Sequence, residues 1–268
     1  MMKSNNDTVT QYDSRKDYFA NYRKKKRGFK FKHLETYQTY AVGEDKRKLG
    51  FKASIMTRKG DIKRLPPYFN FLLSACEEFI DNRNRFPSLR FCSAMNREDS
   101  RRRTMEVLCV LLVRCEMYHG RIGEPTTSGM DTVSHDTLME DYVLRFGKVI
   151  EPSTWRTCVK RLERAGLYNQ KRNYVGVTVD DRVETRSFPA YKHLTGQFFK
   201  EVKVVSYQEV VEMIQNSRTL QEAKGLQFKW INFRELASRK IALWTAVSLN
   251  KESSLTLEFA DAPISPPH

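Results

Sequence analysis

The amino-acid sequence predicts an α+β protein that is mainly α-helical and contains a small amount of β-structure. Apolar residues recur at helical spacing in several separate segments. From Leu167 onward the pattern changes to the alternation of apolar and polar residues that is typical of strands. Apolar residues make up 40% of the chain and charged residues 29%, a balance that is sufficient for a folded core.

The first two predicted helices form the centre of this core. Pro66 and Pro67 are expected to open a helix, because proline is tolerated in a first turn. A second helix, expected from about Ser100, is apolar on almost every side and should therefore be buried. We expect it to end at His119 and Gly120, where the glycine would act as a C-terminal cap.

The middle of the chain predicts a brief strand over residues 121–123, a loop and two further helices. Ser134 is suited to cap the first of these helices, and Gly147 marks its end. The second helix should run from Pro152 to Ala165.

Two alternating segments, residues 174–179 and 182–188, follow this helix directly. The Asp180–Asp181 pair between them favours a turn. Together they predict a β-hairpin.

The C-terminal third contains two helix starts with the signature of a capping box. Ser206 and Glu209 form the first pair, and Asn232 and Glu235 form the second. The proline-containing stretch from Glu252 onward is expected to be disordered.

These elements suggest four regions along the chain. Residues 1–60 form a basic, flexible and partly disordered N-terminal arm, and residues 61–192 form the central domain. Residues 193–251 form a helical C-terminal region that packs on this domain or makes a second lobe. Residues 252–268 form a disordered tail.

The charge of the chain favours a polyanionic partner. There are 47 Lys and Arg against 32 Asp and Glu, which gives a net charge of +15. Cationic side chains that neutralise phosphates release condensed counterions, and this stabilises the complex with any nucleic acid.

Several classes of chemistry are not expected. The five cysteines show no metal-binding spacing and are interpreted as reduced core thiols, and the five histidines are scattered singly. We therefore expect no cofactor, no metal and no catalytic activity. The N-terminus has no apolar signal core and no segment has the length of a membrane span, so we expect a cytoplasmic protein without membrane contact.

The predicted elements follow the order of a winged helix-turn-helix, a fold that binds double-stranded DNA: helix, short strand, helix, helix and hairpin.

The helix over residues 152–165 is expected to have one apolar and one cationic face. The apolar face carries Trp155, Val159 and Leu162, and the opposite face carries Arg156, Lys160 and Arg164. Such a basic stripe suits a helix that enters the major groove. The alternative is a surface helix whose three cations only make the protein soluble, which is a common arrangement. Ser153, Thr154 and Thr157 lie in the first turns, where bases and phosphates are often contacted.

Other cations could contact the flanking phosphates. They are Lys171 and Arg172 at the start of the hairpin, Arg101, Arg102 and Arg103 ahead of the buried helix, and Lys24, Lys25, Lys26 and Arg27 in the basic arm. For the arm, a solvated tail and a DNA- or RNA-binding segment both remain open.

Three short stretches carry a resemblance to a known family. They are Arg101-Arg102-Arg103, the turn from Gly120 to Pro125 with the sequence GRIGEP, and residues 161–168 with the sequence RLERAGLY. They resemble the RepA-type replication initiators of theta-replicating plasmids over about a third of the chain. The resemblance implies binding to a replication origin and recruitment of host replication proteins such as helicase or primase.

Three other functions are compatible with the same sequence. They are a winged-helix transcriptional regulator, an RNA-binding or protein-interaction module, and a metal-dependent nickase. The nickase is disfavoured, because the chain lacks a pair of histidines at metal-binding spacing. The oligomeric state also stays open, since winged-helix proteins bind DNA both as monomers and as homodimers.

Overall fold

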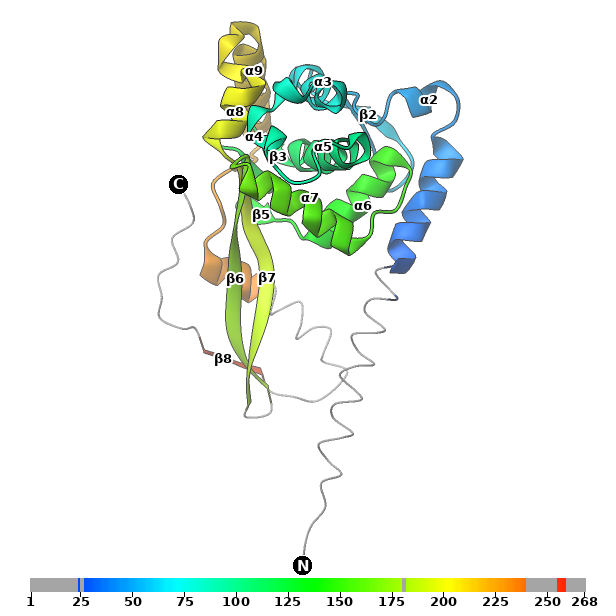
Figure 1. Cartoon of the computed structure of the whole chain (residues 1–268). Helices are drawn as coiled ribbons and strands as arrows, with labels where there is room; N and C mark the ends of the chain where they lie inside the picture. The colour runs from blue at the N-terminus through cyan, green and yellow to red at the C-terminus, as the bar shows by residue number, and fades with distance from the viewer. Residues whose placement is uncertain (1–23, 25–26, 180–181, 240–254, 259–268) are drawn as a thin grey trace, which may run out of the picture.

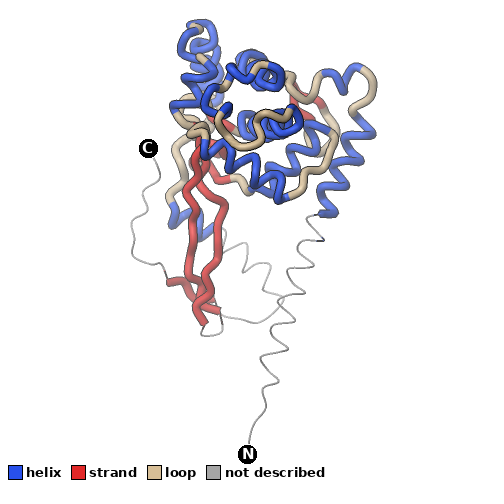
Figure 2. Tube along the Cα trace, viewed as in Figure 1, coloured by secondary structure: helices blue, strands red, loops and turns tan. Residues whose placement is uncertain are grey.

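The computed structural model describes residue 24 and residues 27–179, 182–239 and 255–258. The protein is a mixed α/β structure in which helices dominate and the sheets are small. A helical body carries a long two-stranded hairpin that projects away from it (Figure 1; Figure 2). The prediction of a mainly helical protein with a small β-component is confirmed at this level.

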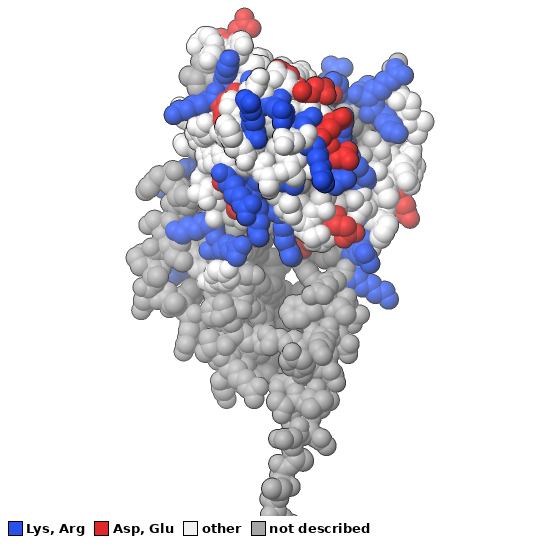
Figure 3. All heavy atoms as spheres, in the orientation of Figure 1, with Lys and Arg blue, Asp and Glu red and all other residues white. Residues whose placement is uncertain are grey.

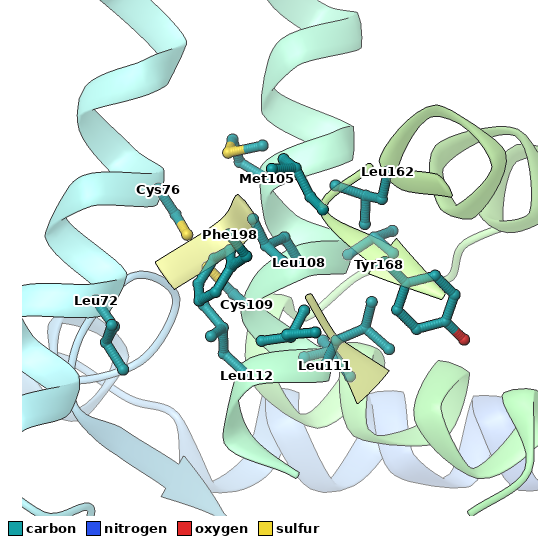
Figure 4. Close-up of a cluster of buried hydrophobic side chains, with 14 of the residues drawn as sticks. Leu72, Cys76, Met105, Leu108, Cys109, Leu111, Leu112, Leu162, Tyr168 and Phe198 are labelled. Atoms are coloured by element: carbon teal, nitrogen blue, oxygen red, sulfur yellow. The ribbon is translucent and has the colours of Figure 1, made fainter. Parts of the chain in front are cut away.

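Two helices form the centre of the body. Helix α3 (Tyr68–Asp81) follows Pro67, which is its N-terminal cap, and packs against α5 (Glu98–Val113). Residues 105–112 of α5 are all buried, so this helix is central as predicted. Figure 4 shows how Leu72 and Cys76 of α3 meet Leu108, Cys109 and Leu112 of α5. The short helices η1 (Arg83–Arg85) and α4 (Pro87–Arg90) connect the two.

The predicted end of α5 at Gly120 is wrong. The helix ends at Val113, and the chain then enters strand β3 (Cys115–Glu116), which pairs with β4 (Arg121–Thr126). Gly120 lies in the turn between these strands with φ of 73°, and a Cβ there would lie 2.4 Å from the carbonyl oxygen of Leu194. Glycine is therefore required at position 120, because the turn between β3 and β4 needs a positive φ and leaves no space for a side chain. Strand β4 also pairs with β5 (Gly129–Thr132), so the predicted loop is itself a hairpin.

The next two helices match the prediction closely. Helix α6 (His135–Phe146) begins with the Ser134 hydroxyl accepting a hydrogen bond from the amide of Thr137, and it ends at Gly147 in the left-handed conformation. Helix α7 (Pro152–Arg164) follows after a short connection.

Strands β6 (Tyr168–Val179) and β7 (Arg182–Leu194) form a hairpin that is longer than predicted. Their antiparallel register shifts between Lys171 and Asn173, which marks a β-bulge. The predicted turn at residues 180–181 lies outside the described residues. Strand β7 also pairs with β4, so the base of the hairpin is joined to the helical body.

The described part of the segment predicted as a flexible arm is folded. A helix covers residues 27–40 and is followed by α2 (Glu44–Arg47) and by the small hairpin of β1 (Ser54–Met56) and β2 (Ile62–Arg64). Tyr37 and Leu49 are buried in a small cluster with Leu144 of α6. The sequence pattern did not predict this packing, because two of the three buried residues in the helix over residues 27–40 are the polar Lys30 and His33, and Phe29 and Phe31 are exposed.

The C-terminal region packs on the body through α8 (Gly196–Val202), η2 (Val204–Ser206) and α9 (Gln208–Glu222). The predicted capping box at Ser206 is wrong, because this residue belongs to η2 and Tyr207 precedes α9 without a side-chain cap. Asn232 does cap the helix over residues 233–239, since its Oδ1 accepts a hydrogen bond from the amide of Glu235. Residues 255–258 of the predicted disordered tail form β8 (Leu255–Glu258), which pairs with β6.

In the described part of the chain, none of the helices combines the length and the apolar character that a membrane crossing requires.

Candidate nucleic-acid interface

Helix α7 has one buried face and one cationic face. Trp155 and Val159 are 1% and 3% exposed, and Leu162 is fully buried, as predicted. Arg156, Lys160 and Arg164 are exposed on the opposite side. Within the described residues, none of these three cations forms a hydrogen bond or an ion pair. Their charges are therefore available to a ligand.

The first turn of α7 is also accessible. Ser153 is exposed, Thr154 is half-buried, and the exposed Thr157 donates its hydroxyl hydrogen bond to the carbonyl of Ser153 at 2.9 Å. The N-cap residue Glu151 makes no side-chain bond to the free amides of this turn. These amides carry the positive end of the helix dipole, which favours an anion.

A partly buried network joins α7 to α6 and to the base of the hairpin. The indole Nε1–H of Trp155 donates to Nδ1 of His135 at 3.0 Å, and Nε2 of the same histidine lies 3.0 Å from Oε1 of Gln170 on β6. Burial, together with the nearby Lys192 cation, lowers the pKa of His135 to about 4. The imidazole is therefore neutral at physiological pH.

Lys192 of β7 is a second buried titratable group, separate from this hydrogen-bond network. Its side chain is fully buried, and its Nζ donates to the carbonyls of Val133 at 2.5 Å and Ala190 at 3.2 Å. Burial lowers the pKa of this amine to about 7. This role could not be predicted from the alternating pattern, because a lysine in an alternating strand is normally exposed.

The base of the hairpin adds two exposed cations beside α7. Lys171 and Arg172 are both exposed and lie at the β-bulge. Figure 3 shows Lys and Arg side chains gathered on the lower part of the coloured surface, where Figure 1 draws α7 and the base of β6.

The three arginines of α5 have different surroundings, and they lie within the helix and not ahead of it. The guanidinium of Arg101 donates to three backbone carbonyls, those of Ile80, Met95 and Asn96, so it holds the loop before α5. Arg102 pairs with Glu98 at 2.8 Å. Arg103 is exposed; burial raises the pKa of Tyr142 on α6 and of Cys158 on α7, and the Arg103 charge offsets part of this rise. Among these three arginines, only Arg103 makes no hydrogen bond or ion pair within the described residues.

Two cations of the N-terminal segment are described. Lys24 and Arg27 are exposed at the start of the first helix. Lys25 and Lys26 lie outside the described residues. Among the described residues, neither Lys24 nor Arg27 forms a hydrogen bond or an ion pair with α7.

The loop over residues 91–97 also borders α7 and was missed by sequence reasoning. The thiol of Cys92 contacts the carbonyl oxygen of Arg161 at 3.6 Å. Burial raises the pKa of this thiol, and the Arg164 and Arg161 charges partly offset the increase. The loop therefore touches the last turn of the cationic helix.

In the described part of the chain, no three His, Cys, Asp or Glu side chains converge in the way a metal site requires. Comparisons with protein-family models, with curated proteins and with solved structures gave no match to this chain. The case for its function therefore depends on the geometry of α7 and the elements around it.

Proposed function

We propose that this protein is a winged-helix protein that binds double-stranded DNA in a sequence-specific manner. In this proposal α7 is the recognition helix and the β6–β7 hairpin is the wing. The observation that carries the proposal is the cationic face of α7, where Arg156, Lys160 and Arg164 are exposed and unpaired opposite a buried apolar face.

The spacing of these cations suits the major groove. At 1.5 Å per residue, positions 156 to 164 extend along about 12 Å of the helix. A helix fits into the major groove, where arginine can donate two hydrogen bonds to a guanine edge and lysine can contact guanine or phosphate.

The surrounding elements support the same docking. Lys171, Arg172 and Arg103 would contact phosphates on either side of the groove, as cations flanking a recognition helix do. The partly buried hydrogen bonds among Trp155, His135 and Gln170 join α7 to the hairpin. This connection lowers the conformational cost of binding. Arg101 and Arg102 have internal partners and are left out of the proposed interface.

Within this class we propose initiation of plasmid replication as the particular function, with an origin as the DNA site and a host helicase or primase as a partner. This step rests on the resemblance of residues 101–103, 120–125 and 161–168 to RepA-type initiators. Supplying the chain in trans to a plasmid that carries its origin should maintain the plasmid. A transcriptional regulator would change promoter activity and would leave the plasmid unreplicated.

Binding to DNA is tested with duplexes selected by the full chain from a random-sequence pool. Their affinity is measured against scrambled duplexes across a salt series. We expect tighter binding to the selected duplexes and a steep linear fall of log K with log salt concentration. Equal affinity for selected and scrambled duplexes would contradict a sequence-specific function, and preference for RNA of the same sequence would favour an RNA-binding role.

A triple variant assigns the binding to α7. Replacing Arg156, Lys160 and Arg164 with glutamine removes the charges and keeps good helix formers. Affinity for the selected duplex should fall, and the slope of log K against log salt should become shallower by about 0.9 for each of the three cations that contacts a phosphate. The matched control replaces three exposed cations of the β1–β2 hairpin, Lys59, Lys63 and Arg64, and should leave the slope unchanged.

A further inference from the structure

The phenyl ring of Phe91 is 86% exposed, more than any other large hydrophobic side chain in the described part of the chain. Isolated exposed apolar residues are common, so exposure alone carries no inference. The position of this ring is informative, because its neighbour Cys92 contacts the last turn of α7.

The loop that carries Phe91 is anchored on both sides. Leu89 and Met95 are buried, and Arg101 donates to the carbonyls of Met95 at 3.0 Å and Asn96 at 2.9 Å. The amide of Cys92 donates to the carbonyl of Leu89 at 2.9 Å. These contacts hold the backbone on both sides of Phe91, so the ring cannot turn into the core without breaking them.

Three exposed arginines belong to the segments around this ring. Arg90 precedes Phe91, Arg97 lies at the N-terminus of α5, and Arg164 lies in the last turn of α7, which Cys92 contacts through the carbonyl oxygen of Arg161 at 3.6 Å. The acidic residues nearest in sequence are Glu98, which pairs with Arg102, and Asp99, which is exposed. An aromatic ring among cations matches a ligand that has flat bases and phosphates.

A protein partner fits this surface less well. Standard protein interfaces bury about 800 Å² on each side. The residues around Phe91 in sequence, Arg90, Ser93, Ala94 and Asn96, are small or polar and exposed, so they offer no continuous apolar patch. A single projecting ring has the shape of a wedge.

We propose that Phe91 inserts between neighbouring base pairs of the DNA that α7 binds, at the Arg164 end of this helix. This inference rests on the proposed DNA-binding function and adds to it a local unstacking of the duplex. Apolar wedges of this kind, phenylalanine among them, partly unstack and kink DNA. For a protein acting at an origin, such a step would mark where the strands begin to separate.

The experiment uses the full chain and a selected duplex in which 2-aminopurine, a base that fluoresces more strongly when unstacked, replaces single adenines within and beside the site. We expect the wild-type protein to raise the fluorescence at one step next to the α7 contact. Phe91→Ala should abolish this rise and weaken binding about 5- to 150-fold, the range that aromatic–base stacking supports. Phe91→Leu should retain part of the fluorescence rise and part of the affinity, because leucine also acts as a wedge.

Tyr118→Ala is the matched control. It removes another exposed aromatic ring, 62% exposed on the β3–β4 turn, and should change neither the affinity for the duplex nor the 2-aminopurine fluorescence. If the wild type binds the selected duplex and Phe91→Ala keeps the same affinity and fluorescence, the wedge is refuted and the proposed function stands. If Phe91→Ala instead only alters self-association in sedimentation, the ring belongs to a contact between copies and the wedge is again refuted. A wild type with no preference for the selected duplexes would overturn the DNA-binding function itself.

Discussion

Gly147 lies directly against the ring of Tyr37, with no room for a side chain between them. A Cβ at position 147 would lie 2.1 Å from Cε1 of the tyrosine. Gly147 also ends α6 with φ of 63°, in the left-handed region that glycine adopts most readily. One position thus terminates α6 and allows the helix over residues 27–40 to pack on the body.

Replacement of Gly147 by alanine should therefore be more destabilising than the left-handed conformation alone explains. That conformation costs a residue with a Cβ about 1–2 kcal/mol. Overpacking against Tyr37 adds about 1–3 kcal/mol. Gly166→Ala is the matched control, since Gly166 has φ of 68° and nothing within 4 Å of its Cβ position. Urea unfolding of the two variants measures the difference, and equal losses would show that Tyr37 moves aside freely.

Trp155→Phe should destabilise the protein by about 2–4 kcal/mol, although the ring stays aromatic. The variant leaves Nδ1 of His135 without its donor in a partly buried site and opens a small cavity. Because an indole nitrogen only donates, Nδ1 must accept and the imidazole proton lies on Nε2, where it donates to Gln170. Denaturant unfolding checks the energy, and ¹⁵N NMR of the wild type checks the tautomer. A proton on Nδ1 would contradict the network.

Lowering the pH should weaken the fold through His135. Its pKa is about 4 in the folded protein against 6.5 for an ordinary histidine, so the unfolded chain binds the extra proton first. This contribution to stability is complete above pH 6.5 and is lost as the pH falls from 6.5 to 4, by about 3 kcal/mol in total. The difference in unfolding free energy between wild type and His135→Gln, followed from pH 7 to pH 4, isolates this residue. A constant difference would contradict the prediction.

Raising the pH should strengthen the fold through Lys192. Burial lowers the pKa of this amine from 10.5 to about 7, so above pH 7 the folded protein releases a proton that the unfolded chain still holds. The free energy of unfolding should rise between pH 7 and pH 10.5, by at most about 1.4 kcal/mol per pH unit. Lys192→Met keeps an unbranched stem without the charge and should lack this rise. Urea unfolding at pH 7, 8, 9 and 10 compares the two, and parallel curves would show that the amine stays charged.

Sequence patterns predicted those elements whose signals are local. Ser134 and Gly147 bound α6 because a hydroxyl cap and a left-handed glycine act within one helical turn. The buried and exposed faces of α7 also follow from spacing alone, since Trp155 and Leu162 lie on one side of any regular helix at these positions.

Features that depend on distant parts of the chain could not be predicted in this way. Gly120 resembles a helix cap in sequence, yet its conformation is required by the approach of Leu194. Arg101 resembles a phosphate contact in sequence. Its guanidinium instead donates hydrogen bonds to three backbone carbonyls, one at the end of α3 and two in the loop before α5. Lys192 is buried because β7 pairs with β4 at its base, a pairing that alternation does not encode.

The hairpin sets the size of any footprint that this protein leaves on a duplex. Strand β6 is 12 residues long, which corresponds to about 40 Å at 3.3 Å per residue, and it starts directly beyond the end of α7. One turn of B-form DNA measures about 34–36 Å. If the ribbon lies along the duplex, nuclease protection should extend about one full turn farther on the side of Arg164 than on the side of Pro152. The polarity of a bound monomer could then be read from the asymmetry of its protected region.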